Sequence, residues 1–310
     1  MKVLVTGGAG FIGSNLCRGL RAEGASVLAL DNLSTGFRAN LVSSPDIDVV
    51  EGDVRHPDTV IAAVRGCEIV FHLAASVGNL RSIEDPVADS ETNVLGTLNV
   101  LQAARRAGVR KVVYSSSAAI FGELKHLPIR EDHPVEPDSP YGASKLAGEK
   151  HCLAFGRLFD LEVVCLRYFN VYGVNQRYDA YGNVIPIFAH RLLSGQPLII
   201  YGDGEQTRDF VHVDDVVRAN IAAALAPGVT GAFNIGSATA VTINRLAELM
   251  RTLGASPAVI EHAPARPGDV RHSRADITAA REALGFRPQM QLEDGLRTYQ
   301  HWLRTQLVTA

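Results

Sequence analysis

The sequence predicts an α/β fold in which helices cover both faces of a doubly wound parallel sheet. Two observations support this prediction. The first half of the 310-residue chain alternates short β-branched runs with longer segments of helical periodicity, and that alternation is typical of βαβ units. Hydrophobic residues make up 46% of the chain, which is enough to fill a sizeable core. We therefore expect an ordered protein with one large sheet.

The strands and helices of the first half follow one another in regular order. Five β-branched runs are predicted as strands: Val3–Thr6, Ser26–Leu30, Asp48–Val50, Ile69–His72 and Lys111–Ser115. Three intervening segments have the length and periodicity of helices: Phe11–Glu23, Pro57–Arg65 and Pro86–Ala107. Gly24, Gly66 and Gly108 stand where helix ends favour glycine. The positions of these glycines thus agree with the predicted alternation of strands and helices.

The second half is less regular and is predicted to form a smaller, interleaved part. After Arg167 the alternation gives way to stretches rich in Gly, Tyr and Pro, with helices expected near Val213–Ala226 and Thr242–Leu253. The sequence contains neither an internal repeat nor a low-complexity linker. We expect residues 1–170 to form one domain and residues 171–310 mainly a second, with some segments returning to the first.

Composition argues against several classes of partner. The chain has 30 Lys and Arg against 33 Asp and Glu, a formal net charge of -3, so neither nucleic acid nor an anionic membrane is the expected partner. The four cysteines lack metal-site spacing, which favours free thiols and predicts no metal site. No stretch approaches the roughly 20 apolar residues of a membrane span. These features predict a soluble cytoplasmic protein.

A glycine motif marks a dinucleotide site of the Rossmann type. The residues GGAGFIG place Gly7, Gly10 and Gly13 between the first strand and the first helix, where unpaired helix amides suit a pyrophosphate. Asp31 ends the second strand, where a carboxylate can bind both ribose hydroxyls and repel a 2′-phosphate. The expected cofactor is therefore NAD rather than NADP. Asp53 either holds the adenine edge or is a solvated turn residue.

A tyrosine and a lysine supply candidate acid-base chemistry. Tyr141 and Lys145 lie four residues apart in SPYGASK, where Ser139 can cap a helix and Pro140 suits its first turn. That spacing places both side chains on one helix face. A phenol is a poor base at neutral pH, but a neighbouring ammonium favours the phenolate. The pair can then accept a proton from a substrate hydroxyl.

Together with HLAA at residues 72–75 and YSSSAAIFG at residues 114–122, these motifs resemble those of a known family. The chain is similar to extended short-chain dehydrogenase/reductases of the NAD-dependent epimerase/dehydratase family that act on nucleotide sugars. The UDP-sugar 4-epimerase branch is the most similar. The resemblance implies a catalytic triad of Ser117, Tyr141 and Lys145. It also implies that Tyr141 deprotonates the C4 hydroxyl, NAD accepts the C4 hydride, and the 4-keto sugar turns over before the hydride returns.

The same resemblance assigns binding residues. Those expected at the cofactor are Gly7, Gly10, Phe11, Ile12, Gly13, Asp31, Asn32, Thr35, Gly36, Asp53, Val54, Leu73, Ala74, Ala75, Asn93, Ser115, Tyr141, Lys145 and Tyr168. Those expected at a UDP-sugar in the second domain or beside the triad are Ser117, Asn170, Arg177, Val184, Ile185, Tyr201, Arg208, Arg266, Asp269 and Ser273. The family also implies a homodimer paired through the helices at residues 86–107 and 141–158.

The choice of reaction and sugar rests on fewer residues. Ala118 and Ala119 stand where related dehydratases and decarboxylases have an acid, and methyl groups cannot assist elimination. The resemblance places Ser273 where the family has a residue that controls the room beside C2 of the sugar. A serine there leaves space for an N-acetyl group, so UDP-glucose/galactose and UDP-GlcNAc/GalNAc are both expected substrates. Arg177 leaves open a UDP-glucuronic acid 4-epimerase. A nucleotide-sugar 4-reductase, which would consume nicotinamide, and a non-catalytic redox sensor also remain alternatives.

Overall fold

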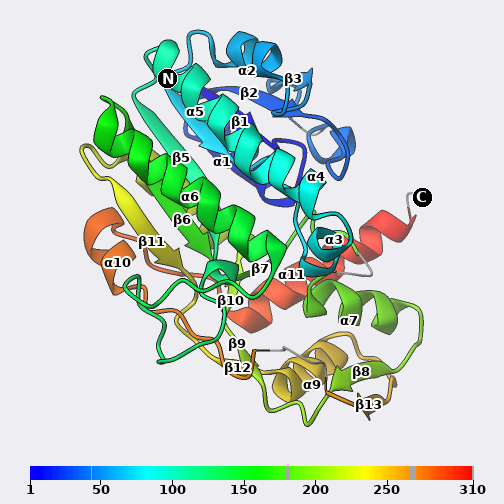
Figure 1. Cartoon of the computed structure of the whole chain (residues 1–310). Coiled ribbons are helices and arrows are strands. Elements are labelled where there is room, and N and C mark those ends of the chain that lie inside the picture. The colour runs from blue at the N-terminus through cyan, green and yellow to red at the C-terminus, as the bar shows by residue number, and fades with distance from the viewer. Residues whose placement is uncertain (43, 179–181, 266–269, 309–310) are drawn as a thin grey trace.

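A seven-stranded parallel sheet forms the centre of the computed structural model, which describes residues 1–42, 44–178, 182–265 and 270–308 (Figure 1). Its strand order is β11-β6-β5-β4-β1-β2-β3. The strands span β1 Lys2–Thr6, β2 Ser26–Asp31, β3 Asp48–Glu51, β4 Ile69–His72, β5 Lys111–Ser117, β6 Glu162–Tyr168 and β11 Gly231–Ile235. Chain order reverses between β1 and β4, which is where α/β sheets bind dinucleotides. The predicted doubly wound fold is confirmed.

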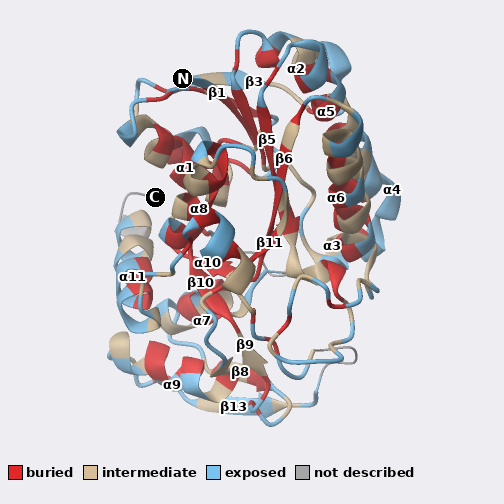
Figure 2. Cartoon of the chain, turned by 90° about the vertical axis from the view of Figure 1, so that its left-hand side faces the viewer, coloured by how far each residue is buried: buried red, intermediate tan, exposed pale blue. Residues whose placement is uncertain are grey.

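Helices cover both faces of this sheet and give the molecule three layers (Figure 2). One face carries α1 Phe11–Ala22, α8 Val213–Leu225 and α10 Thr278–Leu284; the other carries α2 Pro57–Val64, α5 Gly96–Arg106 and α6 Pro140–Leu158. A side chain at Gly19 would meet Val217 at 2.5 Å, so α1 and α8 pack closely. The second half of the chain therefore returns to the sheet, while the domain boundary near residue 170 stays a prediction.

Three predicted helices end at glycines, as expected. Gly24, Gly66 and Gly108 adopt φ values of 80°, 70° and 68°, a left-handed conformation that costs glycine little. The expected helix at Pro86–Ala107 differs from the prediction, because it contains α4 Pro86–Ser90, a π-helical turn η2 at Glu91–Leu95, and α5. Strand β6, with its Val-Val-Cys-Leu run, was not predicted; it begins a few residues after the long helix α6.

A smaller lobe lies below the sheet in Figure 1. Its parallel pair consists of β8 Leu198–Tyr201 and β13 Ile260–Ala263. The helices α7 Val184–Leu193, α9 Ile243–Leu253 and α11 Leu292–Val308 share an apolar core that includes Phe188, Leu246 and Tyr299. Two short pairs of strands connect the smaller lobe to the sheet. One consists of β7 Asn170–Tyr172 and β10 Phe210–His212, and the other of β9 Thr207–Arg208 and β12 Val241–Thr242. Within the described ranges, no helix has the length and apolarity to cross a membrane.

Candidate active site

The glycine-rich loop lies at the carboxyl edge of β1. A Cβ at Gly7 would lie 2.8 Å from the Ala74 nitrogen, and one at Gly13 would lie 2.0 Å from the Gly7 carbonyl oxygen. The loop is therefore packed too tightly for any side chain at either position. Gly10 precedes α1 and offers no side-chain cap, so the amides of the first turn, including Phe11 and Ile12, remain available to an anion. This arrangement fits a pyrophosphate.

Asp31 holds two parts of this site together. Its Oδ2 accepts a hydrogen bond from the Ala9 amide at 2.9 Å, and its Oδ1 accepts one from the Leu33 amide at 2.8 Å. Each carboxylate oxygen keeps a further lone pair, so both remain able to accept from ribose hydroxyls. Gly36 lies against the carboxylate, since a Cβ there would be 2.8 Å from Oδ1. The ribose contact itself stays a prediction.

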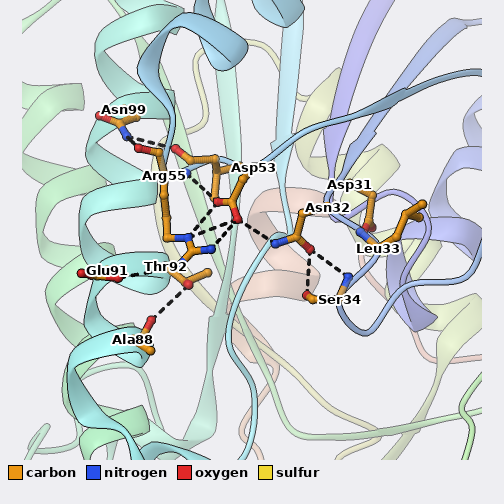
Figure 3. A network of polar contacts seen from close by, with 11 residues as sticks. Asp31, Asn32, Leu33, Ser34, Asp53, Arg55, Ala88, Glu91, Thr92 and Asn99 are labelled. Carbon is orange, nitrogen blue, oxygen red and sulfur yellow. Dashed lines mark hydrogen bonds and ion pairs between the residues drawn. The ribbon is translucent and has the colours of Figure 1, made fainter.

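Asp53 belongs to a polar network beside this loop (Figure 3). Its Oδ2 accepts from the Asn32 amide at 2.8 Å and from Arg55 at 2.8 Å. The hydrogen bonds from Arg55 hold the pKa of Asp53 well below its usual range. Arg55 also lies 3.6 Å from Glu91 in the π-helical turn. Asp53 is thus an anchored carboxylate. Its partner Arg55 was not predicted, because its only signal in the sequence is its place two residues after Asp53.

The three expected catalytic residues meet at the carboxyl edge of β5. Ser117 ends that strand, and its side chain is close enough to Tyr141, at the start of α6, to lower the pKa of the phenol. Ser139 caps α6 by accepting from the Gly142 amide at 3.1 Å, so the predicted cap is confirmed. Ser82 accepts from the Tyr141 amide at 3.0 Å. Two further serines thereby fix the first turn of the helix that carries Tyr141.

Lys145 lies in a buried setting one turn along α6. Its side chain is 3% exposed, and its Nζ lies 4.5 Å from the centre of the Tyr114 ring. Burial lowers the pKa of Lys145 to about 8. Burial also raises the pKa of Tyr141, although the nearby Ser117 hydroxyl partly opposes this shift. A neighbouring ammonium was expected to lower the pKa of Tyr141; the pKa is raised instead, because desolvation of the phenolate is the largest cause and Asp89 adds to it.

Replacing Lys145 by Met is expected to stabilise the cofactor-free protein at pH 7. A lysine whose pKa falls from 10.5 to about 8 on folding costs on the order of 3 kcal/mol. That cost is present in full below about pH 8 and is relieved as the pH rises toward 10.5, where the unfolded chain also loses the proton. The free energy of unfolding should therefore rise in Lys145→Met at pH 7, with a smaller gain at pH 10. Equal stability at pH 7 would contradict this account.

A second polar network fixes α6 against the π-helical turn. The Asn93 amide donates to the Ser76 carbonyl, Asp89 and Ser144 at 3.0, 3.1 and 3.0 Å. Its oxygen accepts from the Ser76 amide at 2.9 Å. Ser144 lies between Tyr141 and Lys145 in sequence, so this network reaches the catalytic turn. The expected contact of Asn93 with the cofactor stays a prediction, and Asp89 and Ser144 were missed because no motif marks them.

Behind the triad lies a buried ion pair between Glu149 on α6 and Arg167 on β6. Arg167 donates to the Glu149 carboxylate at 2.7 and 3.0 Å, and Ser116 donates to it at 2.6 Å. The side chains of Arg167 and Glu149 are 6% and 0% exposed. Because Ser116 precedes Ser117, this pair ties β5, β6 and α6 together directly beneath the triad.

The remaining cofactor candidates occupy neighbouring strand ends. Leu73 and Ala74 follow β4, where their amides donate to the Thr6 backbone and side chain at 3.1 and 3.2 Å. Tyr168 ends β6, and its hydroxyl accepts a hydrogen bond from the Asn220 side chain at 2.8 Å. These positions line the carboxyl edge of the central sheet. Val54 is buried in the apolar core between the central sheet and helices α2 and α5.

The expected substrate residues lie in or beside the smaller lobe. The Asn170 amide and the Arg208 guanidinium donate to the backbone carbonyls of Asp209 and Val270, at 3.2 and 2.6 Å. Ser273 is buried, and its backbone amide donates to Thr207 at 3.1 Å. Further candidates lie at the start of α7 and the end of β8: Val184, Ile185 and Tyr201. Arg266 and Asp269 lie outside the described residues.

Arg177 takes a position that the sequence did not indicate. Its guanidinium lies 4.0 Å from the centre of the Phe37 ring, and Phe37 belongs to the loop that follows β2 and Asp31. This places the arginine beside the expected ribose end of the dinucleotide site. Among the residues that the structure describes, no cluster of three His, Cys, Asp or Glu side chains suits a metal ion.

Comparisons with known proteins agree with this geometry. The family model described as "NAD dependent epimerase/dehydratase family" matches residues 3–236. A UDP-glucose 4-epimerase of Mycolicibacterium smegmatis is 42% identical over 96% of both chains. The solved UDP-glucose 4-epimerase of Thermotoga maritima, with UDP-glucose, is 37% identical at a TM-score of 0.94, covering 99% of this chain and 100% of that one. A UDP-N-acetylglucosamine 4-epimerase of Methanobrevibacter ruminantium M1 is 35% identical at a TM-score of 0.94, over 98% of both chains.

Proposed function

Because the chain belongs to the NAD-dependent epimerase/dehydratase family, we propose that it epimerises a UDP-hexose at C4. NAD is the cofactor of this family. The observation that carries the proposal is the placement of Ser117, at the end of β5, beside Tyr141, at the start of α6, with Lys145 buried one turn along that helix. All three lie at the carboxyl edge of the same sheet as the glycine-rich loop. A sugar carbon can therefore lie between the triad and the cofactor.

Each side chain of the triad has a separate role in transferring the proton of the C4 hydroxyl. Bound NAD would supply the acceptor for the C4 hydride, and its positive nicotinamide would favour the Tyr141 phenolate that burial disfavours in the chain alone. Tyr141 takes the proton of the C4 hydroxyl and returns it after the sugar has turned over. Ser117 orients the C4 oxygen, while Lys145 holds positive charge beneath the phenol. No atom is gained or lost over the cycle.

The residues that follow Ser117 favour epimerisation over dehydration. Ala118 and Ala119 begin a short 3₁₀ helix, η3, at Ala118–Ile120. The Ala119 amide donates to Ser117 Oγ at 3.1 Å, so this turn is held against the triad. Elimination of water needs a group there that can take or give a proton, and a methyl group can do neither. Reversible oxidation at C4 requires only the triad and NAD.

Ser273 supports a substrate range that includes N-acetylhexosamines. Its small side chain lies in the segment of the smaller lobe that pairs with Thr207, and a larger residue there would restrict a C2 substituent. We infer that UDP-glucose and UDP-GlcNAc are both substrates, since a pocket that admits the larger sugar also admits the smaller one. The structures of the relatives support UDP as the nucleotide.

Incubating the purified protein separately with UDP-glucose, UDP-GlcNAc and UDP-glucuronic acid, without added nicotinamide, tests this proposal. The expected products are the C4 epimers of the first two sugars, resolved by chromatography or NMR. In a separate incubation with added NADH, stoichiometric consumption of the NADH would instead identify a 4-reductase. Conversion of UDP-glucuronic acid alone would identify the uronate epimerase. No product from an NAD-loaded, folded protein would contradict UDP-sugar epimerisation altogether.

We propose that the protein is a homodimer paired through the helices around α4 and α6. Apolar side chains are unusually exposed there: Ile83, Val87 and Leu95 are 59%, 67% and 54% exposed. Such a patch favours burial against a second copy. Light scattering is expected to give twice the chain mass for the native protein and the chain mass for Val87→Glu. The matched variant Val42→Glu, at a site 75% exposed, should stay dimeric. A monomeric native protein would contradict this proposal.

A further inference from the structure

Two loops from distant parts of the chain border the glycine-rich loop. The first follows β2: the Phe37 amide and the Asn40 side chain both donate to the Ala9 carbonyl, at 3.0 and 2.9 Å. Leu33 in this loop has a positive φ of 58°, and the Asp31 carboxylate holds its amide at 2.8 Å. The loop is therefore fixed directly to the expected phosphate site.

The second loop crosses the first turns of α1 from the side of the smaller lobe. The Val174 carbonyl accepts from the Asn15 side chain at 2.8 Å. The Asn175 amide group lies 3.0 Å from Ser14 Oγ, and Asn175 is also held at a positive φ, 71°. Backbone strain of this kind persists where surrounding contacts enforce it and is frequent at functional sites. Residues 174 and 175 thus lie on the helix end that faces the expected pyrophosphate.

Arg177 and Phe37 join these loops. The Arg177 guanidinium carbon lies 4.0 Å from the centre of the Phe37 ring, which is close enough for a cation–π contact. A second link runs beneath them, because Arg18 on α1 donates to the Asn40 carbonyl at 3.0 Å and to Asn15 at 2.6 Å. Phe37 is 43% exposed, so burial in an apolar core does not explain a large ring at this position.

We propose that Arg177 and Phe37 form a clasp that retains the cofactor. The expected pyrophosphate and adenosine ribose lie between the two loops, so the dinucleotide leaves only when the loops separate. The face of the guanidinium stacks on the ring, while the N–H groups at its edge can attract phosphate oxygens. Retention suits a reaction that must return the hydride to the same sugar. That advantage rests on the proposed epimerase function, whereas the clasp itself requires only NAD binding.

The dissociation rate of NAD tests the clasp without any sugar. Protein loaded with NAD is mixed with excess alcohol dehydrogenase and ethanol, which report released NAD as NADH absorbance. Arg177→Ala and Phe37→Ala are each expected to release NAD about 3- to 30-fold faster, the range of a cation–π contact. Because both variants break the same contact, the double variant should be no more than about twofold faster than the faster single variant. Phe37→Tyr, which keeps an aromatic face, should release NAD at nearly the native rate.

Arg251→Ala is the matched control, since Arg251 is an arginine on α9 that pairs with Glu248 at 2.8 Å. Its NAD dissociation rate should equal that of the native protein. Rates for Arg177→Ala and Phe37→Ala within twofold of the native rate would overturn the clasp. An unchanged NAD rate in Arg177→Ala combined with a raised KM for UDP-glucuronic acid would also overturn it and assign Arg177 to a substrate carboxylate. Failure of sugar turnover in the native protein would leave the NAD measurement intact.

Discussion

Replacing Tyr141 by Phe is expected to lower kcat by about 100- to 10,000-fold, the usual contribution of a positioned acid-base group. The variant removes one oxygen atom, and its ring still fits the space at the start of α6. Ser117 Oγ keeps the hydrogen bond that it accepts from the Ala119 amide, and the helix cap at Ser139 remains. NAD content and the free energy of unfolding should therefore change little while turnover is lost.

The matched control removes a different buried phenol. Tyr299 on α11 donates to the Gln176 carbonyl at 2.7 Å, and it lies in the core of the smaller lobe rather than at the triad. Tyr299→Phe should lose about 1 kcal/mol of stability and keep its kcat. If Tyr141→Phe retained more than a tenth of the native kcat, another group would have to move the C4 hydroxyl proton.

Replacing Arg167 by Met is expected to destabilise the protein by about 3–5 kcal/mol, because it leaves the Glu149 carboxylate buried without its cation. That carboxylate is 0% exposed, and Ser116 alone cannot neutralise its charge. Urea unfolding measures the loss. The double variant Arg167→Met/Glu149→Gln should recover much of it, since an amide removes the buried charge and can still accept the Ser116 hydrogen bond.

A surface ion pair provides the comparison. Arg297 and Glu293 pair at 2.7 Å on α11, where both side chains are more than half exposed, so Arg297→Met should cost no more than about 1 kcal/mol. Equal losses in Arg167→Met and Arg297→Met would show that Glu149 is not held as a buried charge. Equal losses would also show that the Arg167–Glu149 pair does not hold β5, β6 and α6 together.

The sequence could predict the parts of the fold that depend on local patterns. The strand at Ile69–His72 has the predicted bounds, since a short β-branched run between turns has few alternatives. The π-helical turn at Glu91–Leu95 could not be predicted, because apolar spacing does not reveal one extra residue in a helical turn. The contacts that hold Asn93 come from Ser76 and Ser144, which are distant in sequence.

The candidate site likewise contains residues that could be predicted from local sequence and residues that could not. Tyr141 and Lys145 were identified by a spacing of one helical turn, and Ser117 by a resemblance. The buried setting that raises the pKa of Tyr141 arises from elements that meet only in the folded chain. Glu149 carries no motif, because its partners Ser116 and Arg167 meet it only in the folded chain. Arg55 binds the nearby Asp53, but its second partner, Glu91, comes from a distant segment. The contact of Arg177 with Phe37 likewise joins two halves of the chain.

The most direct test of the central claim follows a label at C4. UDP-glucose carrying deuterium at C4 is incubated with the NAD-loaded protein in ordinary water, and the UDP-galactose formed is analysed by mass spectrometry and NMR. Transient oxidation within one bound complex predicts that the product keeps the deuterium at C4. Loss of the label to solvent, or its appearance in added nicotinamide cofactor, would contradict epimerisation by a hydride that leaves and returns within the same site.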